Sequence, residues 1–245
     1  MTKRMRFFYS HLCASLIIAI IIAGIVLGIW YPFPLSKATG MTHIILMMFV
    51  IDVIIGPILG LIVYKEQKKS LKFDLSVVIV LQILAMSYGI YSLAEGRPVW
   101  IVGNGNRFEL VRNNEVILQN TAKAQPIYQH TSWLGPQYVS IQYAKDPKVR
   151  SQQIFEEVMG GISLSQRPEM YQSLASVKTT IAKNAKNLSE LEQYNEKKEV
   201  TQTLANYPQA DSFVPLKANA VDMTVLIDKK NGGKVVKIVD LRPWK

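Results

Sequence analysis

Three long apolar stretches dominate the first 96 residues of the chain. They cover residues 12–30, 42–64 and 75–94, and Asp52 is the one Asp, Glu, Lys or Arg among them. A helix rises 1.5 Å per residue, so about 20 residues span the roughly 30 Å hydrocarbon core of a bilayer. The pattern therefore predicts three transmembrane helices within residues 1–96.

The first stretch also has the basic start of a secretory signal peptide, because it follows Lys3, Arg4 and Arg6. A signal peptide has an apolar region of about 7–15 residues that ends in a small-x-small cleavage site. Here the apolar region is longer, and residues 28–32 read Gly-Ile-Trp-Tyr-Pro. We therefore expect the first helix to be retained.

The Lys and Arg residues of the short loops predict how the helices are oriented. Three precede the first helix and four lie between the second and third, whereas Lys37 alone lies between the first and second. Short loops that are rich in Lys and Arg stay in the cytoplasm. We expect a cytoplasmic N-terminus, which places residues 97–245 on the far side of the membrane.

Residues 97–245 are numerous enough to bury a core and begin and end with hairpin patterns. Near the start, apolar runs flank the turn sequence Gly-Asn-Gly-Asn at 103–106. Near the end, residues 221–227 alternate between apolar and polar, a Gly-containing turn follows, and 235–241 run back. Both patterns are typical of β-hairpins.

Helical patterns fill the middle of this region. One apolar face at 154–159 ends at Gly160-Gly161, and a second series of apolar residues spaced by three and four follows Arg167-Pro168 as far as Leu188. The sequence thus predicts a membrane α-helical region of three transmembrane helices, followed by an α+β domain with N- and C-terminal β-hairpins around central helices.

Asp52 is the most unusual residue of the apolar half. A carboxylate within a membrane span is costly and normally faces protein, water or a partner charge. Pro57 follows it and favours a kink, while Gly56 and Gly60 place two small residues on one helix face. One interpretation is internal helix packing, with Asp52 protonated or bonded to a neighbour such as Gln82. The other is a docking groove for a foreign transmembrane helix; a proton or ion pathway has less support.

A second candidate position lies at the entry to the third helix, at Phe73 and Asp74. Asp74 suits the first turn of a helix, where a carboxylate stabilises the positive end of the helix dipole. A partner contact at Phe73 and Asp74 is the alternative. Helix capping is the simpler interpretation of Asp74.

The residue inventory argues against catalysis. With one cysteine and three scattered histidines, the chain has little material for a metal site, and the outer region has a single histidine for any Ser-His-Asp arrangement. There is no P-loop and no complete dinucleotide fingerprint. Basic residues are spread along the chain without the aromatic interleaving of nucleic-acid modules. We expect no enzyme, no cofactor, no metal and no nucleic-acid partner.

Six segments carry a resemblance to a known family: Trp30–Leu35, Val50–Tyr64, Ser70–Ser76, Glu95–Pro98, Arg167–Tyr171 and Asp240–Trp244. Through them, nearly the whole chain resembles the TfpX/TfpZ family of type IV pilin accessory proteins. The most specific part is the block Asp-x-x-x-Gly-Pro in the second segment, followed by Leu-Lys-Phe-Asp-Leu-Ser in the third.

The resemblance implies a multi-pass protein of the bacterial inner membrane with a periplasmic C-terminal domain, needed for efficient pilus assembly. It implies the major type IV pilin as partner, together with the lipid bilayer and other pilus machinery. A pilin waits in the membrane as one apolar helix with a periplasmic head. The hypothesis is a pilin-specific chaperone that contacts the pilin helix through Asp52 and its neighbours and the head through the outer domain, for example at Tyr171.

Two other classes of function stay open. A membrane-anchored periplasmic sensor would suit an outer domain on a few spans, although the chain has little cytoplasmic material to pass a signal on. A pilin-modifying enzyme such as a glycosyl transferase is less favoured, because no acidic catalytic cluster is evident in the sequence.

Overall fold

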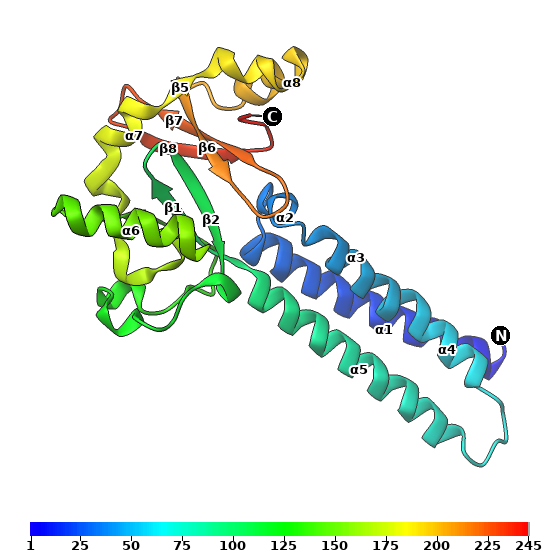
Figure 1. The fold of residues 1–245 in the computed structure, drawn as a ribbon. Helices are drawn as coiled ribbons and strands as arrows, with labels where there is room; N and C mark the ends of the chain where they lie inside the picture. Colours follow the sequence, from blue (N-terminus) through cyan, green and yellow to red (C-terminus); the bar gives the residue numbers. More distant parts are fainter. Residues whose placement is uncertain (245) are drawn as a thin grey trace. The chain divides into compact units, whose positions relative to one another are not determined.

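The computed structural model describes residues 1–244, which form two compact units (Figure 1). The first unit comprises residues 1–36 and 41–96, and the second comprises residues 37–40 and the chain from Arg97 onward. The segment 37–40 joins the second unit because the Ala38 carbonyl accepts hydrogen bonds from the main-chain N–H groups of Ala220 and Val221, at 2.9 and 3.2 Å. The sequence pattern did not predict this contact.

The first unit contains three helical runs that are long and apolar enough to cross a membrane: Lys3–Trp30, Thr42–Val63 and Leu71–Gly96. The first run is α1 (Lys3–Ile25) with the π-helical turn η1 (Val26–Trp30), and the third is α5 (Leu71–Gly96). The middle run joins α3 (Thr42–Phe49), the π-helical η2 (Val50–Ile55) and α4 (Gly56–Val63). A short helix, α2 (Leu35–Ala38), precedes it.

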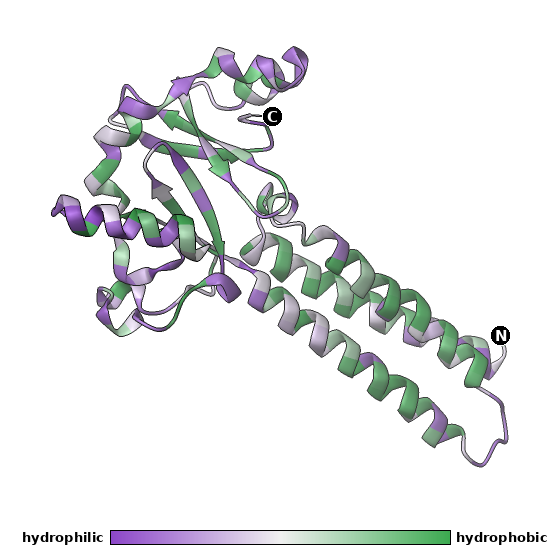
Figure 2. Cartoon of the chain, viewed as in Figure 1, coloured by the Kyte–Doolittle hydropathy of each residue, from purple (hydrophilic) through white to green (hydrophobic). Residues whose placement is uncertain are grey.

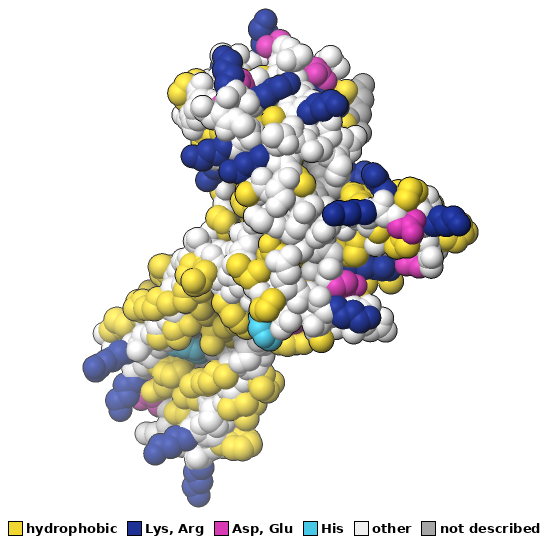
Figure 3. All heavy atoms as spheres, turned by 90° about the vertical axis from the view of Figure 1, so that its left-hand side faces the viewer, with side chains coloured by type: hydrophobic (Ala, Val, Ile, Leu, Met, Phe, Trp, Pro, Cys, Tyr) yellow, Lys and Arg dark blue, Asp and Glu magenta, His cyan; other side chains and the backbone are white. Residues whose placement is uncertain are grey.

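The outward faces of these helices are apolar. Figure 2 shows the three runs mainly in green, with pale and purple segments between, and Figure 3 shows apolar side chains over much of the helical unit on the face in view. Ile17, Ile20 and Leu84 are each about 60% exposed, at 59%, 61% and 61%. Exposing such area to water costs about 25 cal/mol per Å², so an apolar surrounding is the environment that these faces fit.

The π-helical segment η2 lies directly before Pro57. Proline has no N–H, and its ring crowds the carbonyl four residues earlier, here that of Val53. The helix widens by one residue at this point, and the Gly56 N–H bonds to the Ile51 carbonyl, five residues back. The break foreseen at Pro57 thus takes the form of a π-helical segment that contains Asp52.

Eight strands form one mixed sheet within the described part of the second unit. Its order is β4-β3-β1-β2-β6-β7-β8, and β5 pairs with β6. The strands are β1 (Pro98–Asn104), β2 (Arg107–Arg112), β3 (Gln137–Ile141), β4 (Tyr171–Ser173), β5 (Lys186–Asn187), β6 (Ser212–Lys217), β7 (Met223–Asp228) and β8 (Lys234–Val239).

Both predicted hairpins are present, as the antiparallel pairs β1–β2 and β7–β8. The turn of the first contains Gly105 at φ 65°, a value that favours glycine. The hairpins do not flank the helices as separate units, because β6 pairs antiparallel with β7 and parallel with β2 and so joins them in one sheet. The parallel pairing of β1 with β3 extends the sheet on the other side.

Three α-helices accompany the sheet within residues 97–244: α6 (Pro147–Gly160), α7 (Lys178–Asn184) and α8 (Lys197–Ala205). Short 3-10 turns, η3 to η9, fill the connections: Asn113–Glu115, Thr121–Lys123, Pro126–Tyr128, Leu164–Gln166, Pro168–Met170, Leu174–Val177 and Leu188–Gln193. One hydrophobic cluster gathers around Trp100 and Leu164, and another gathers around Phe213 and Leu226.

The long helix predicted from Arg167 to Leu188 is wrong. Within that range, the structure has an α-helix only at α7. Residues Tyr171–Ser173 pair with β3 instead, Tyr171 opposite Ile141 and Ser173 opposite Val139. The side-chain spacing favours a helix only weakly, because local helix preferences amount to a few tenths of a kcal/mol per residue. The main-chain pairing with β3 at the sheet edge stabilises the strand by more than this.

The helix predicted at 154–159 is present as part of α6, which ends at Gly161 with φ 66°. Its apolar residues, however, face outward: Phe155, Val158 and Met159 are 63%, 73% and 70% exposed. Spacing alone predicts that a helix has an apolar face, and the rest of the fold decides whether anything covers that face.

Candidate functional site

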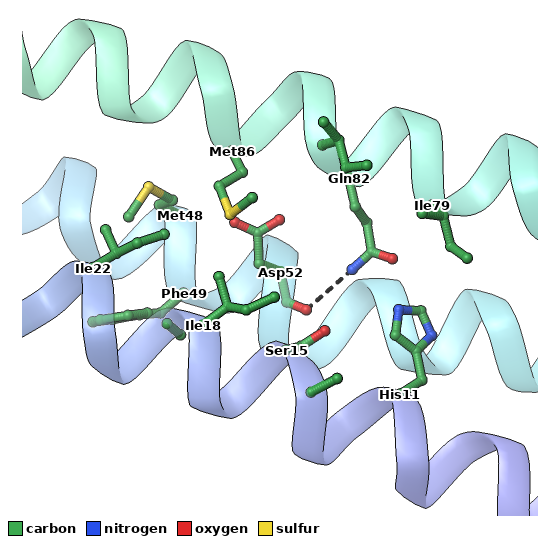
Figure 4. A pocket seen from close by; sticks show the side chains of 13 residues that line it. His11, Ser15, Ile18, Ile22, Met48, Phe49, Asp52, Ile79, Gln82 and Met86 are labelled. Carbon is green, nitrogen blue, oxygen red and sulfur yellow. Dashed lines mark hydrogen bonds between the residues drawn. The ribbon is translucent and has the colours of Figure 1, made fainter.

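The candidate site is a crevice between the long helices of the first unit (Figure 4). Both α1 and α5 pack against the middle run, and a cavity of about 250 Å³ lies among them. Most of its lining is apolar. The polar members are His11 and Ser15 from α1, Asp52 from η2 and Gln82 from α5, so each helical run contributes at least one.

Asp52 belongs to the middle helical run and lines this crevice. Its side-chain Oδ1 is buried and has no hydrogen-bond partner. Gln82 does reach Asp52, but its Nε2 donates to the main-chain carbonyl, at 3.2 Å, rather than to the carboxylate (Figure 4). Asp52 and Gln82 are therefore in contact as anticipated, but the Asp52 carboxylate accepts no hydrogen bond from Gln82. Asp52 also lines a second cavity, of about 320 Å³, with Met47 and Tyr88.

Two more polar side-chain atoms in the crevice lack hydrogen-bond partners. Gln82 Oε1 and His11 Nδ1 are both buried without a hydrogen-bond partner. More than nine in ten buried polar groups in proteins are paired, and lipid offers no substitute partner. Two of the three atoms, Asp52 Oδ1 and Gln82 Oε1, are oxygens that accept hydrogen bonds. The crevice thus has the chemistry to receive a hydrogen-bond donor between apolar walls.

The two glycines of the middle helix serve contacts inside the helical unit. A Cβ at Gly56 would lie 1.8 Å from Gln82 Nε2, and a Cβ at Gly60 would lie 3.1 Å from both His11 Nδ1 and Phe7 Cε1. Together with Pro57, both glycines are buried. Internal packing accounts for Gly56, Pro57 and Gly60. The docking interpretation stays a prediction and concerns Asp52.

Phe73 and Asp74 lie apart from the crevice, at the start of α5. The Phe73 side chain is 70% exposed. Asp74 is in the first turn of the helix, where its Oδ2 accepts a hydrogen bond from Ser70 Oγ at 3.0 Å and forms an ion pair with Lys68 Nζ at 2.5 Å. Its role is to tie the preceding loop to the helix start, through side chains rather than by capping main-chain N–H groups.

Tyr171 is a core residue, which corrects its prediction as a partner contact. It is 2% exposed and its ring packs edge-on against Trp100, with centroids 5.3 Å apart. Its hydroxyl donates to the main-chain carbonyl of Ser165. Burial raises the pKa of the Tyr171 hydroxyl. A partner that binds the surface does not reach this side chain.

A buried carboxylate in the sheet domain had no sequence signal. Glu109 Oε2 accepts hydrogen bonds from Ser163 Oγ at 2.8 Å and Ser165 Oγ at 2.6 Å, while Oε1 accepts them from Arg107 Nε at 2.7 Å and Asn104 Nδ2 at 3.2 Å. Burial opposes ionisation of Glu109, but these hydrogen bonds, led by Ser165, outweigh it and lower its pKa. The two serines lie more than 50 residues away in the chain, so no local motif predicts that they meet Glu109.

Comparisons with known proteins agree with one another. A family model described as "Fimbrial assembly protein FimB" matches residues 1–40. The fimbrial assembly protein of serogroup I from Dichelobacter nodosus is 28% identical to this chain over 229 residues, which cover 89% of this chain and 88% of the relative. The protein of serogroup E1 from the same organism is 27% identical over the same coverage.

A third relative from Dichelobacter nodosus, the fimbrial assembly protein of serogroups C1 and C2, is 32% identical over 116 residues. The alignment covers 46% of this chain and 88% of that relative. No solved structure matches the chain.

Proposed function

The chain belongs to the family of fimbrial assembly proteins, and from this premise we propose that it is an inner-membrane assembly factor that holds the major type IV pilin before the pilin enters the pilus. Its role in fimbrial assembly follows the family. The finer assignment, a pilin-specific chaperone of the TfpX/TfpZ type, is the proposal. It rests on the segments that carry that resemblance and on the crevice around Asp52.

The proposed location is the bacterial inner membrane, with the N-terminus in the cytoplasm and the sheet domain in the periplasm. Three helices of sufficient length and apolarity support it, as does the concentration of Lys and Arg before α1 and between α4 and α5. In this arrangement the helical unit meets the pilin's apolar helix, and the sheet domain is available to the pilin's head.

The single observation that carries the proposal is that Asp52 Oδ1 is buried without a hydrogen-bond partner in a mostly apolar crevice. An apolar helix lying along the crevice would cover side chains such as Ile18, Phe49 and Ile83, and lipid would lose contact with them. A hydrogen-bond donor on that helix would give Asp52 the partner that it lacks. Packing against small and apolar side chains drives such helix association, and the hydrogen bond adds specificity.

The free energy of the Asp52 hydrogen bond determines how large a change in pilin affinity an experiment must detect. Hydrogen bonds between helices in membranes contribute about 0.6 kcal/mol on average and at most about 1.7 kcal/mol. With tenfold in affinity for each 1.4 kcal/mol, Asp52→Ala should weaken pilin binding about 3- to 15-fold. Glu66→Ala is the matched control, because it also removes one carboxylate from the helical unit but is exposed in the loop after α4 and does not line the crevice.

The test is crosslinking in intact membranes together with co-purification of the pilin. A photo-reactive residue at Ile83, which lines the crevice, should form adducts with the pilin. The same residue at Ile20, which is 61% exposed and does not line the crevice, should form few. Equal adducts from both positions, or none from either while pilin is present, would contradict docking in the crevice. An Asp52→Ala variant that binds pilin as well as Glu66→Ala would contradict it too.

We also propose that the chain acts without catalysis. Among residues 1–244, no three His, Cys, Asp or Glu side chains gather as a metal site would require. Ser15 and His11 also line the crevice, but Asp52 Oδ1 and His11 Nδ1 have no hydrogen-bond partner, so neither atom is paired with the Ser15 hydroxyl as a catalytic base would be. An intact-mass comparison of pilin from cells with and without this protein tests the point, since any mass difference would indicate a modification.

A further inference from the structure

The loop before β3 ends in an exposed apolar tip. Trp133 and Leu134 are 59% and 84% exposed, although both are large and apolar. The tip is a built turn, in which the Leu134 N–H donates to Ser132 Oγ at 3.0 Å and Gly135 follows at φ 103°. Two adjacent apolar side chains are therefore presented by an ordered backbone.

The tip is attached to the first residue after α5. Arg97 directly follows Gly96, where α5 ends, and it is 2% exposed. Its guanidinium lies over the Trp133 ring, 4.0 Å from the centroid, and its Nε donates to the Ser132 carbonyl at 3.4 Å. Its Nη2 donates to Thr131 Oγ1 at 3.3 Å. Cation–π and hydrogen-bond contacts thus hold the tip at the point where the chain leaves the helix.

The length of α5 gives the depth of that point. If residues 75–94 fill a hydrocarbon core of about 30 Å, two more residues carry the helix about 3 Å further. The headgroup layer adds about 5 to 7 Å on each side of the core, so Arg97 lies within it. The Trp133 ring is in contact with Arg97 and therefore lies at nearly the same depth, which is where Trp side chains are enriched in membrane proteins.

We propose that Trp133 and Leu134 insert into the boundary between headgroups and acyl chains of the outer leaflet, and so anchor the sheet domain to the lipid surface. This inference rests on the membrane insertion in the proposed function and is independent of pilin binding. Leu134 contributes apolar area and Trp133 an amphipathic ring, the two components of interfacial membrane anchors. The partner is lipid, because the tip contacts Arg97, the first residue after α5, which lies at the depth of the headgroups.

The experiment uses the full chain in nanodiscs that contain lipids with nitroxide groups, without pilin. Cys13 is first replaced by Ser, so that a single introduced cysteine carries an environment-sensitive fluorophore. The test position is Leu134→Cys. The control is Asn106→Cys, an exposed residue at the far end of the β1–β2 hairpin, about seven strand residues or roughly 20 Å from Arg97. A second control, Leu84→Cys, lies in the middle of α5.

Quenching at position 134 should be at least threefold stronger than at position 106, with a blue-shifted emission. Strong quenching at 84 with equal, weak quenching at 134 and 106 would overturn the anchor and leave membrane insertion standing. Weak quenching at all three positions would overturn both. If the tip is quenched but the crevice forms no pilin adducts, the docking proposal falls and the anchor remains. Because Leu134 is 84% exposed, its replacement leaves the folded core untouched.

Discussion

Replacing Glu109 by Gln should lower the free energy of unfolding of the sheet domain by about 2 kcal/mol. Glu109 is 6% exposed. Its Oε2 accepts hydrogen bonds from the hydroxyls of Ser163 and Ser165, and its Oε1 accepts them from Arg107 and, at the longer distance of 3.2 Å, from Asn104. Gln keeps the shape of the side chain and removes the charge, so the change isolates what ionisation contributes.

The magnitude follows from these partners. A hydrogen bond to a charged group contributes about 1 kcal/mol more than one between neutral groups. Ser165 loses that full difference, and Ser163 loses less, because its one hydroxyl hydrogen also lies within reach of Glu157 Oε1, at 2.9 Å. The Arg107 pair adds less than about 1 kcal/mol, since its side chain is 39% exposed and solvent screens it.

The same group predicts a dependence on pH. The pKa of Glu109 is lowered from its ordinary value of 4.5, because its hydrogen bonds outweigh the opposing effect of burial. A carboxylate with a lowered pKa in the folded state stabilises the fold above the unfolded pKa, and this contribution disappears as the pH falls through the folded pKa. The difference between the native chain and Glu109→Gln should therefore be full at pH 7 and shrink below about pH 4.5.

The assay is urea unfolding of the full chain in nanodiscs, followed by near-ultraviolet circular dichroism, to which the buried Trp100 contributes. With a slope of about 1 to 3 kcal/mol per molar urea, the midpoint should fall by roughly 1 M. Glu169→Gln is the matched control, because Glu169 Oε2 is buried without a hydrogen-bond partner and the change removes no bond there. Equal midpoints for the two variants, or a difference that persists unchanged at pH 3, would refute the reasoning.

Two further predictions concern glycines. Gly60→Leu should cost about 1 to 3 kcal/mol, because a Cβ there already lies 3.1 Å from two rings of α1, whereas a Cβ at Gly28 meets nothing within 4 Å. Thermal unfolding in detergent should separate Gly60→Leu from Gly28→Leu, and equal midpoints would contradict the packing. Gly233→Ala should cost more than Gly232→Ala: both have positive φ, 78° and 74°, but a Cβ at Gly233 would lie 2.4 Å from a backbone carbonyl of α7. The urea midpoints of the two variants measure this difference. Equal midpoints would contradict the prediction and show that α7 moves away from the added methyl group at no cost.

Much of the candidate site was visible in the sequence, but its geometry was not. Asp52 stands out because a charge within an apolar stretch is rare. The roles of Gly56 and Gly60 depend on which helix approaches them, and Gln82 and His11 come from other parts of the chain. Spacing within one helix could not indicate that the glycines face inward while the carboxylate lines a cavity.

The same limit explains the two corrections in the sheet domain. The helical spacing after Arg167 was real, yet Tyr171 pairs with β3, about 30 residues earlier in the chain. The motif that ends at Tyr171 made it a plausible surface contact, and the fold buries it against Trp100. In both cases a partner distant in sequence outweighed a local pattern.

The sequence by itself determined the apolar helices, the loops that join them and the two hairpins, because each depends on a pattern within about 25 consecutive residues. Only the tertiary structure decided which polar atoms in the crevice lack hydrogen-bond partners and which groups donate hydrogen bonds to Glu109. It also decided that the tip at Trp133 and Leu134 packs against Arg97. The physical reason is that burial and hydrogen bonding are properties of pairs of groups, and these pairs form between segments that the chain brings together only on folding.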